Sequence, residues 1–597
     1  IQGDSSIGGY EDYNGNTGGG RVTEGKSLKI IGNDHTLHLN TSTDDSSYAN
    51  GTGAGLGYRR GAFRAGMGIT TATRLEVSHA TIINNITGGI FQAVGYYGNS
   101  PDMNTAQASS PTFVYDNVTV SNGSSLYAAM PIRNDEGKVL FTGTNKFSML
   151  QNHNFNDASN SGADNQGEWI QGGAWTEIVN GTTTVEQSWG NDQPLYGYGH
   201  NNATLKVDDG ANLNWNLNKT YTMYYDDWTK GALTWDIGNN ASFIINGTTN
   251  TATNFAGGWW MWLTYNAWNL NVGTNGRFIA SSGGGVIGLG DTGWGANSFS
   301  NGPVKWNFAQ GSEVLFNNLN TGNNPLLVGK PGAGSGVAIN DAKTVTLNTV
   351  GGAPVFATSV INFPITINGN GLRTHSSKQA AVYDASYSLQ TPNETKILND
   401  DIWYRQNTGT ISGLGTGSPS NSLTPNPYSG ADMTTINSAK YISWYQPIGV
   451  GIYGNLSDMS RTYDIGLGNL PADGTLSTNI NGKANQTLVV RDDRGQKPNY
   501  NVTIAMTNLN MADKLNFAWV DPVSATSTDL TLNQAQKIAS VSDDATLPAF
   551  ISQAGGGAFY TMTFNTDKGL QIKANNKLKL QTNANAGTFK YSINNGI

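Results

Sequence analysis

A short template of apolar and turn residues returns many times between Ile31 and Val345, and it constrains the fold more than any other feature. In each copy an apolar residue is followed by small or polar turn residues and then, six positions after the first, by a second apolar residue. From the first copy to the last, the template advances by about 34 residues per repeat. The paired apolar residues are Ile31/Leu37, Val77/Ile83, Val114/Val120, Phe141/Phe147, Val207/Leu213, Ile237/Phe243, Val272/Phe278, Phe308/Val314 and Ile339/Val345.

Each repeat also contains a second segment with the composition of a β-strand, such as "WWMWLTY" at residues 259–265. Several strands per repeat, each stacked on its counterpart in the next repeat, describe a right-handed parallel β-helix. Asn and Gly are frequent at the turns because both tolerate left-handed backbone angles. Each coil of such a solenoid buries its inward residues only against its neighbours, so many coils are needed for stability. We expect an all-β chain in which residues 1–375 form about ten coils.

The composition agrees with a large, well-packed β protein. The chain has 15 Trp and only 13% charged residues, which excludes a disordered chain. It has no Cys, which excludes a disulfide scaffold and thiolate metal sites. A net charge of −8 argues against a nucleic-acid partner. No apolar stretch of the sequence reaches membrane-spanning length and the first residue is Ile, so we expect a mature or excised fragment that does not insert into a membrane.

The repeat disappears toward the C-terminus, where the pattern changes to that of a different β domain. Residues 376–440 include a stretch rich in Ser, Thr, Gly and Pro, and we expect them to connect or cap the coils. Residues 487–508 alternate like a half-buried pair of antiparallel strands, with the apolar residues Leu488 and Val490 on the first strand and Val502, Ile504 and Met506 on the second. Residues 441–597 are therefore predicted to form a β-sandwich.

Together the two parts resemble a known kind of surface protein. The repeats resemble the pectate-lyase-like adhesive domain of surface adhesins from Gram-positive lactic acid bacteria. Residues 441–597 resemble a WxL-like domain through "VVRDDRG" at residues 489–495 and "AGTFKYSI" at residues 586–593, whereas the Trp-x-Leu pairs of that family are absent. The resemblance implies a secreted adhesin on the bacterial cell surface, anchored to the cell wall through regions outside this sequence.

A β-helix also suggests a polysaccharide lyase or a glycoside hydrolase, but fold alone establishes neither activity. A lyase of this type needs a basic residue facing a carboxylate cluster that binds calcium. The basic residues of the repeats are scattered along the sequence, as at Arg59, Arg60, Arg64, Arg74, Arg133, Lys206, Lys230 and Arg277. A hydrolase needs paired carboxylates, and the best pair, Asp226–Asp227, is also typical of a turn at a strand end. We expect no catalytic, metal or cofactor site.

The densest aromatic run, "GGWWMWLTYNAW" at residues 257–268, indicates a binding surface instead. If Met261 and Leu263 face the core, alternation along the strand places Trp260 and Trp262 on the outer face. Tyr and Trp from successive coils then form a ladder with steps of about 4.8 Å, on which sugars stack. The alternative is that the rings fill the interior, where Trp is usually buried. The candidate ligand-binding residues are Tyr196, Tyr198, Tyr224, Asp226, Asp227, Trp228, Trp260, Trp262 and Trp268.

Three functions are compatible with the sequence. The first is a non-catalytic, monomeric adhesin that binds a host or environmental glycan, mucin or extracellular-matrix protein along the outer face of the β-helix. The second is an enzyme that degrades polysaccharides. The third is a structural stalk that holds another module away from the cell. We favour the adhesin, because the sequence offers a ring-bearing face but no ordered set of catalytic residues.

Overall fold

The computed structural model describes a chain whose regular elements are all β-strands within the ranges given at the end of this paragraph. The chain divides into two compact units. The first consists of Ile1–Gly369, Ser376–Ala381 and Thr408–Tyr445, and the second contains the remaining residues. In these ranges no helix is long and apolar enough to cross a membrane. The described residues are 2–3, 5–9, 20–21, 26–41, 63–65, 73–84, 89–93, 111–122, 132–134, 137–149, 169–171, 175–187, 195–197, 202–217, 223–225, 232–248, 259–263, 267–283, 286–289, 302–329, 331–356, 363–368, 372–391, 402–406, 409–412, 420–421, 437–445, 450–453, 475–476, 480–481, 486–492, 499–510, 517–542, 547–554, 559–564, 567–572, 575–579 and 586–595.

The first unit contains a sheet of ten short strands, which we call the short-strand sheet. Each strand pairs in parallel with the corresponding strand of the preceding and following repeat. The strands, in spatial order, are β2 (Gly20–Arg21), β5 (Phe63–Ala65), β7 (Phe91–Ala93), β9 (Ile132–Asn134), β12 (Ile170–Gln171), β15 (Leu195–Gly197), β18 (Met223–Tyr225), β21 (Trp259–Leu263), β24 (Val286–Leu289) and β27 (Leu327–Val328).

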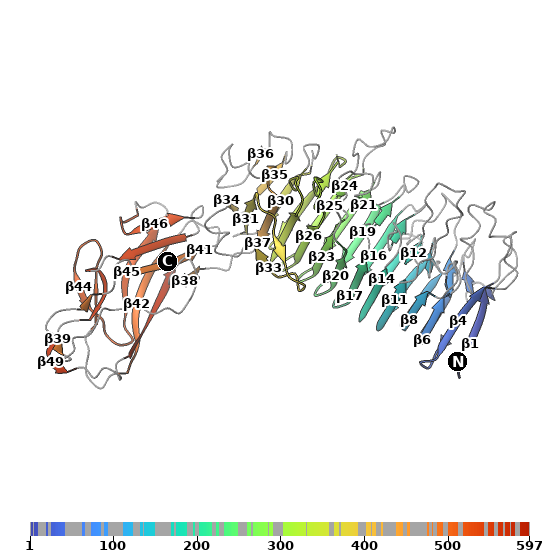
Figure 1. Cartoon of the computed structure of the whole chain (residues 1–597), viewed down its shortest axis with the longest axis horizontal. Helices are drawn as coiled ribbons and strands as arrows, with labels where there is room; N and C mark the ends of the chain where they lie inside the picture. The colour runs from blue at the N-terminus through green and yellow to red at the C-terminus, as the bar shows by residue number, and fades with distance from the viewer. Residues whose placement is uncertain are drawn as a thin grey trace. The chain divides into compact units, whose positions relative to one another are not determined.

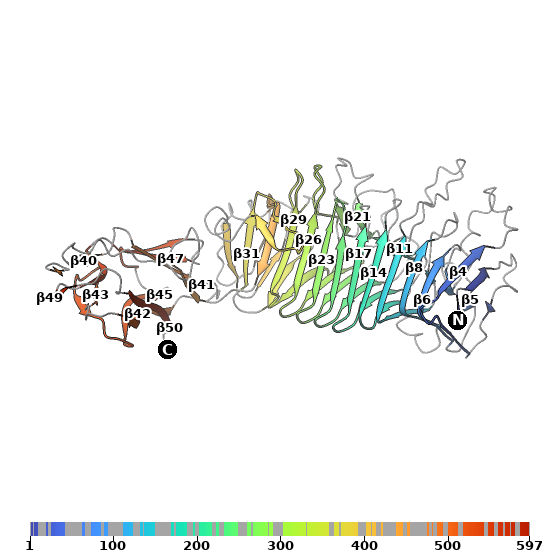
Figure 2. The ribbon, with the colours of Figure 1, turned by 60° about the horizontal axis from the view of Figure 1, so that its bottom comes forward.

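The larger sheet of the first unit, which we call the long-strand sheet, takes two strands from most repeats, joined by a tight turn. Counterparts again pair in parallel and lie side by side in Figures 1 and 2. The strands of the first unit in this sheet are β1 (Ser5–Gly9), β3 (Ser27–Ile31), β4 (Thr36–Thr41), β6 (Arg74–Asn84), β8 (Thr112–Asn122), β10 (Lys138–Thr142), β11 (Thr144–Met149), β13 (Trp175–Ile178), β14 (Thr182–Gln187), β16 (Ala203–Val207), β17 (Asn212–Leu217), β19 (Ala232–Ile237), β20 (Ser242–Asn246), β22 (Ala267–Val272), β23 (Arg277–Ser282), β25 (Val304–Phe308), β26 (Glu313–Asn318), β28 (Gly336–Asn340), β29 (Thr344–Thr349), β30 (Ile365–Asn368), β35 (Gly409–Ser412), β36 (Ser420–Asn421) and β37 (Tyr441–Tyr445). By the division of the chain, β31 (Leu372–Ser377) is shared between the two units and β34 (Ile402–Gln406) belongs to the second.

The sequence template corresponds to these strand–turn–strand pairs, so the predicted repeat is confirmed at the level of paired strands. Val207, Ile237 and Val272 align with one another and are buried. In the early copies, the residues that pair between neighbouring strands lie one position away from those that the sequence template aligned. The residues that align with Val77 are Ile30 and Tyr115, not Ile31 and Val114, and the residue that aligns with Leu37 is Ile82, not Ile83.

The tight turns contain residues with a left-handed backbone conformation, usually one per turn and two, Asn33 and Asp34, in the first, and this requirement explains the turn composition. These residues have φ between 47° and 74°. All of them are Gly, Asn, Asp or His, the types that adopt this conformation at least cost. Side chains also link successive turns: the backbone N–H of Asn239 donates to Asp209 Oδ1 at 2.7 Å, and that of Thr274 donates to Asn239 Oδ1 at 2.9 Å. The left-handed residues are Asn33, Asp34, His79, Asn117, Gly143, Gly181, Gly210, Asn240, Asn275, Gly311 and Asp341.

Aromatic rings fill the core between the two sheets. The ring of Phe91, from the short-strand sheet, lies 5.7 Å from that of Tyr115 in the long-strand sheet. Farther along, the ring of Trp268 lies 5.7 Å from that of Trp235 and 5.3 Å from that of Trp306, both in edge-to-face geometry. Offset and edge-to-face ring pairs of this kind add about 0.5–1.5 kcal/mol each to the effect of burial. The core therefore runs from repeat to repeat as a chain of ring contacts.

Antiparallel strands cover the last parallel strands of the long-strand sheet. β37 pairs antiparallel with β29, and β35 pairs antiparallel with β30. An edge covered in this way is no longer free to pair with another chain. The pairing corrects the expected domain boundary at residue 441, because residues 441–445 belong to the first unit through β29. Residues 376–440, expected to be a single connecting region, are divided between the two units.

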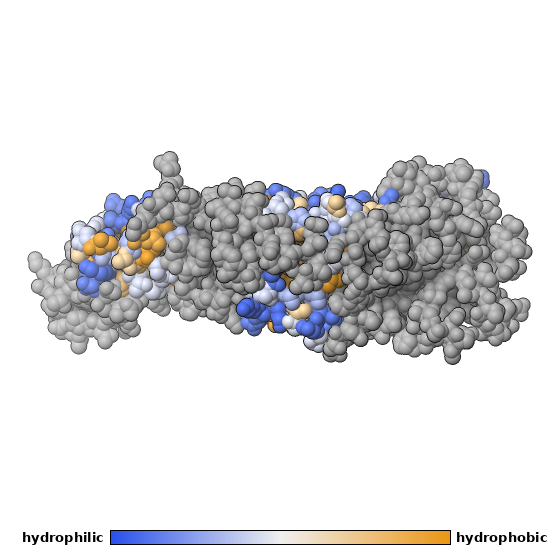
Figure 3. All heavy atoms as spheres, turned by 90° about the horizontal axis from the view of Figure 1, so that it is seen from above, coloured by the Kyte–Doolittle hydropathy of each residue, from blue (hydrophilic) through white to orange (hydrophobic). Residues whose placement is uncertain are grey.

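The second unit consists of antiparallel strands around a core of its own, which includes Val490, Tyr500 and Trp519. The predicted strands at residues 487–508 exist but do not pair with each other: β41 pairs with β38 and β47, and β42 pairs with β45 and β50. In Figure 3 the described surface of this unit shows an apolar area. The strands are β32 (Val382–Tyr383), β33 (Leu389–Thr391), β38 (Val450–Tyr453), β39 (Thr475–Leu476), β40 (Ile480–Asn481), β41 (Gln486–Asp492), β42 (Asn499–Asn510), β43 (Phe517–Val520), β44 (Ser527–Asp529), β45 (Ala535–Ser542), β46 (Ile551–Ala554), β47 (Phe559–Phe564), β48 (Gly569–Ile572), β49 (Asn575–Lys579) and β50 (Ala586–Asn595).

Candidate functional site

Three of the candidate rings occupy one line across the short-strand sheet. β15, β18 and β21 are neighbours, and their register aligns Tyr196 with Tyr224 and Tyr224 with Trp262. Neighbouring strands of a sheet lie about 4.8 Å apart. The three residues therefore stand at successive steps of what we call the column, the line of register positions that contains them.

The positions next to the column belong to the core. In β9, β12 and β24 the residue just before the column position is Ile132, Ile170 and Ile287, respectively. All three of these side chains are fully buried. Because successive residues of a strand lie on opposite faces, the column is on the face away from the core. Farther along, the column reaches Val328, which is only 5% exposed, so this face is covered at the last strand of the sheet.

Trp260 does not belong to the column. The register between β21 and β24 shifts between Trp259 and Met261, which makes Trp260 the extra residue of a β-bulge. A bulged residue has no direct partner on the neighbouring strand, and the bulge changes the local twist. Trp260 therefore stands outside the register that relates Trp262 to its neighbours, and its place on the outer face stays a prediction.

Trp268 is a core residue, which corrects its assignment to the ligand-binding set. It lies in β22 of the long-strand sheet and is 0% exposed. Its neighbours along the strand alternate between half-buried and buried positions, and Trp268 occupies a buried one. A ring packed between Trp235 and Trp306 cannot contact a ligand without unfolding of the repeat. The remaining candidates, Tyr198, Asp226, Asp227 and Trp228, lie outside the described residues.

The column continues toward the N-terminus with basic and amide residues that the sequence interpretation missed. From Tyr196 the register leads to Gln171, then to Arg133, Gln92, Arg64 and finally Arg21. Basic residues that are scattered along the sequence thus fall on one line of the sheet. Arg64 and Arg133, which are far apart in the sequence, are related through Gln92 by the pairing of β5, β7 and β9.

A weak sequence signal for this line exists. In most of the short strands an apolar residue is followed by the column residue and then by a third residue, as in "FRA", "FQA", "IRN", "LYG" and "MYY". Aligning these tripeptides gives the column. The signal is difficult to find because the tripeptides are short and the segments between them vary in length.

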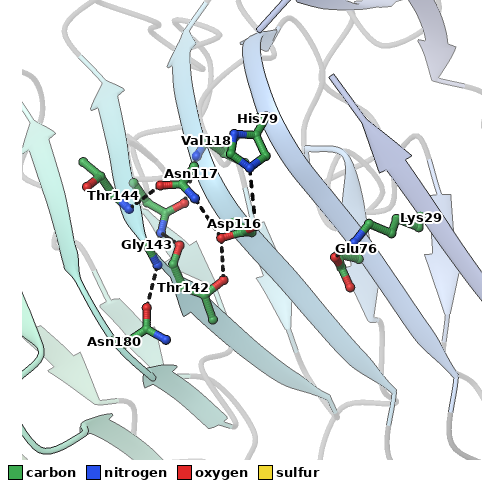
Figure 4. Close-up of polar contacts among 11 residues, drawn as sticks. Lys29, Glu76, His79, Asp116, Asn117, Val118, Thr142, Gly143, Thr144 and Asn180 are labelled. Atoms are coloured by element: carbon green, nitrogen blue, oxygen red, sulfur yellow. Dashed lines mark hydrogen bonds and ion pairs between the residues drawn. The ribbon is translucent and has the colours of Figure 1, made fainter. Parts of the chain in front are cut away.

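A second group of polar side chains lies on the turns of the long-strand sheet (Figure 4). His79 Nε2 is 4.0 Å from Asp116 Oδ2, and the Thr142 hydroxyl donates to Asp116 Oδ1 at 2.9 Å. The Asn117 side-chain amide also donates to Asp116 Oδ1, at 3.0 Å, while its oxygen accepts the Thr144 N–H at 2.9 Å. The Asp116 carboxylate therefore accepts two hydrogen bonds, from the Asn117 amide and from the Thr142 hydroxyl, and His79 lies beside it. This arrangement ties the turns together rather than activating a nucleophile.

The outer face of the long-strand sheet carries a group of partly buried charges. The Lys206 ammonium is 3.0 Å from Glu177 Oε1 and 2.5 Å from Asp208 Oδ1, and the Trp175 indole N–H donates to Glu177 Oε2 at 2.8 Å. Burial acts to raise the pKa of Glu177, but the hydrogen bonds from Trp175 and Lys206 outweigh it, so the pKa is lowered. Burial raises the pKa of Asp236, which lies one strand beyond Lys206. Two carboxyl groups here have pKa values shifted in opposite directions.

Comparison with protein-family models, with curated proteins and with solved structures finds no match. Within the described ranges, no group of three or more His, Cys, Asp or Glu side chains is arranged to hold a metal ion. The candidate site is therefore defined by the geometry of this chain: the first eight positions of the column, from Arg21 to Trp262, on the outer face of the short-strand sheet.

Proposed function

We propose that this chain is a non-catalytic adhesin that is exposed on a bacterial cell surface and binds glycans. In this proposal the first unit is a right-handed parallel β-helix of about ten coils, as in pectate-lyase-like adhesive domains, and the second is a WxL-like β-sandwich. Ten parallel short strands, regular turns with left-handed residues, and a core enclosed between two parallel sheets support the β-helix. Separate antiparallel sheets around one core support the sandwich.

The observation that carries the binding function is the alignment of Tyr196, Tyr224 and Trp262. Rings at steps of about 4.8 Å match the spacing of successive sugars in an extended polysaccharide. Tyr and Trp combine an apolar face, which stacks on a sugar ring, with a polar group that binds a hydroxyl. A rigid sheet holds the three positions without a loss of loop entropy on binding, so several modest contacts add up to useful affinity.

A glycoside hydrolase is the second candidate, and one observation favours it. Glu177 and Asp236 are separated by one intervening strand, about 9.6 Å at the backbone, and their pKa values are shifted apart. Inverting hydrolases use an acid and a base about 6.5–9.5 Å apart. Against this, the Lys206 ammonium lies on the strand between them and occupies Glu177 Oε1, the atom that would have to accept a proton from water.

The first experiment measures retention of the protein on immobilised polysaccharides. We expect Tyr224→Ala combined with Trp262→Ala to weaken retention by about tenfold or more, since each lost stacking contact removes ~1 kcal/mol. The matched control is Trp175→Ala, a half-buried ring in the long-strand sheet. Equal retention of the double variant and the wild type would refute binding through the column.

The same samples separate binding from catalysis. The adhesin proposal requires retention without the release of reducing or unsaturated ends from the polysaccharide. Release that is abolished by Asp236→Asn would establish the hydrolase instead. Retention on no polysaccharide or matrix protein would favour a structural stalk.

A further inference from the structure

The first eight positions of the column form two chemically different halves, and this division points to the kind of polymer that they bind. The first five positions are Arg21, Arg64, Gln92, Arg133 and Gln171. The next three positions are the aromatic residues described above. The change from basic and amide residues to aromatic residues occurs in a single step, between β12 and β15. Eight strands at about 4.8 Å per step span roughly 34 Å.

Each half suits a different part of a polysaccharide. Arg guanidinium groups bind carboxylates and sulfates through paired N–H donors, and Gln amides bind hydroxyl groups. Arg21 and Arg64 are one strand step apart, and Arg133 is two steps, about 10 Å, beyond Arg64. Anionic groups on nearby sugars of one chain could engage all three positions. The aromatic half offers stacking, which does not depend on charge.

We propose that the column binds a linear anionic polysaccharide along its length, with carboxylate- or sulfate-bearing sugars over Arg21, Arg64 and Arg133 and with sugar rings stacked over Tyr196, Tyr224 and Trp262. This inference rests on the proposed adhesive function and adds the ligand class and the direction of charge along the site. The chain as a whole carries a charge of −8. A polyanion is therefore repelled by most of the surface, which confines binding to the basic half of the column.

The overall negative charge also favours a polysaccharide over a nucleic acid. Proteins that bind nucleic acids generally present a basic domain, with an isoelectric point above about 9. Here the isoelectric point is about 5.3. A nucleic acid places a charge on every residue of its backbone, whereas only part of this column is basic. Single-stranded DNA is therefore included in the test as a competing polyanion.

The test compares one polymer in a charged and an uncharged form. Hyaluronan and chondroitin sulfate are immobilised next to derivatives without charge that keep the same backbone: carboxyl-reduced hyaluronan, and chondroitin sulfate that is both carboxyl-reduced and desulfated. The protein variants are Arg21→Gln/Arg64→Gln/Arg133→Gln and Tyr224→Ala/Trp262→Ala. Gln already stands at two positions of the column, so the sheet accommodates this residue type there. Arg64→Gln alone is matched by Arg74→Gln, an exposed residue of β6 that is paired with Glu76.

We expect the wild type to bind the charged forms more tightly and the triple Arg variant to lose about tenfold in affinity for them, ~1.4 kcal/mol. Affinity for the uncharged forms should not change in this variant, whereas the aromatic variant should lose affinity for both forms. Added salt should weaken only the charge-dependent part. Hyaluronan and chondroitin sulfate together distinguish carboxylates from sulfates.

Several results would overturn the inference. Equal affinity of the wild type for charged and uncharged polymers, no binding of either anionic polymer, or equal effects of Arg64→Gln and Arg74→Gln would each do so. Tighter binding of single-stranded oligothymidylate than of either polysaccharide would assign the column to nucleic acids. Binding of the uncharged forms that depends on Tyr224 and Trp262 would leave the adhesive function intact even when the charge dependence fails.

Discussion

Replacing Trp268 tests the structure directly, because the sequence suggested a ligand contact where the structure has a core residue. The side chain is 0% exposed and makes edge-to-face contacts with Trp235 and Trp306. Its indole N–H has no hydrogen-bond partner among the described residues, and the same holds for the indoles of Trp235 and Trp306. Replacing a ligand-binding surface ring would weaken ligand binding and leave stability unchanged. Replacing Trp268 should instead lower stability, because the ring is part of the core.

The magnitude follows from burial. A buried Trp removes about 150–250 Å² of surface from water, worth ~4–6 kcal/mol at about 25 cal/mol per Å². Measured losses for replacing a buried Trp by Ala are about 3–5 kcal/mol, which we take as the expected cost of Trp268→Ala. Trp268→Phe keeps most of the ring and removes the unpaired buried N–H, whose desolvation costs about 1–3 kcal/mol. We expect Trp268→Phe to change stability by less than ~1 kcal/mol.

Hydrogen exchange measured by mass spectrometry on proteolytic fragments is the suitable assay, because the chain has two units and a single unfolding midpoint would mix them. A loss of ~4 kcal/mol corresponds to about a thousandfold faster exchange through the open state. The effect should centre on β19, β22 and β25, since each repeat packs only against its neighbours. Strands of the second unit serve as the internal control.

Two results would refute this reasoning. Unchanged protection of β22 in Trp268→Ala would mean that the ring is not part of the core. A Trp268→Phe variant that keeps its protection but loses glycan retention would return Trp268 to the binding site.

The remaining predictions concern two turns and a partly buried carboxyl group. Gly181 and Gly210 both have left-handed φ values, 72° and 74°, but a Cβ on Gly181 would lie 2.1 Å from the Gly143 carbonyl oxygen, whereas one on Gly210 would meet nothing within 4 Å. In the same hydrogen-exchange assay, read on the strands that flank each turn, Gly210→Ala should cost ~1–2 kcal/mol for the backbone conformation alone. Gly181→Ala should cost ~1–3 kcal/mol more because of the clash, and equal losses would contradict the turn geometry. The pKa of Asp236 is raised above its ordinary value of 3.8, mainly by burial. The contribution of this carboxyl group to stability is therefore fully present below its ordinary pKa and is lost as the pH rises through the raised pKa. Asp236→Asn should therefore stabilise the protein at neutral pH, and the gain should disappear on acidification below the ordinary aspartate range; a gain that persists in acid would point to a cause other than ionisation.

Much of the fold could be predicted because its requirements are local. A turn that needs a left-handed residue selects Gly, Asn, Asp or His, as at Gly210 and Asn240, whatever the rest of the chain does. The apolar residues that flank the turn, such as Val207 and Leu213, must be buried because both strands leave the same turn toward the same core. These constraints repeat in every unit, so the sequence shows them many times.

The errors arise where one residue decides the face. A shift of one position along a strand moves a side chain from one side of the sheet to the other. At "FVYD" both Val114 and Tyr115 are apolar enough to face inward, and only the alignment of Tyr115 with Val77 and Phe141 shows which one does. Simple alternation along the strand does not fix the face of Trp260 either, because a bulge interrupts the register there.

The sequence by itself determined the repeat and the turn residues and indicated that Tyr and Trp recur in successive repeats, because these depend on a period that is visible along the chain. Only the strand register aligned Tyr196 with Tyr224 and Tyr224 with Trp262. Only the tertiary structure decided that Trp268 belongs to the core and that Arg21, Arg64 and Arg133 share a line with the rings. The physical reason is that strand register is set by hydrogen bonds between repeats of unequal length, and no local feature of a tripeptide such as "FRA" or "IRN" specifies which residue of another repeat will lie beside it.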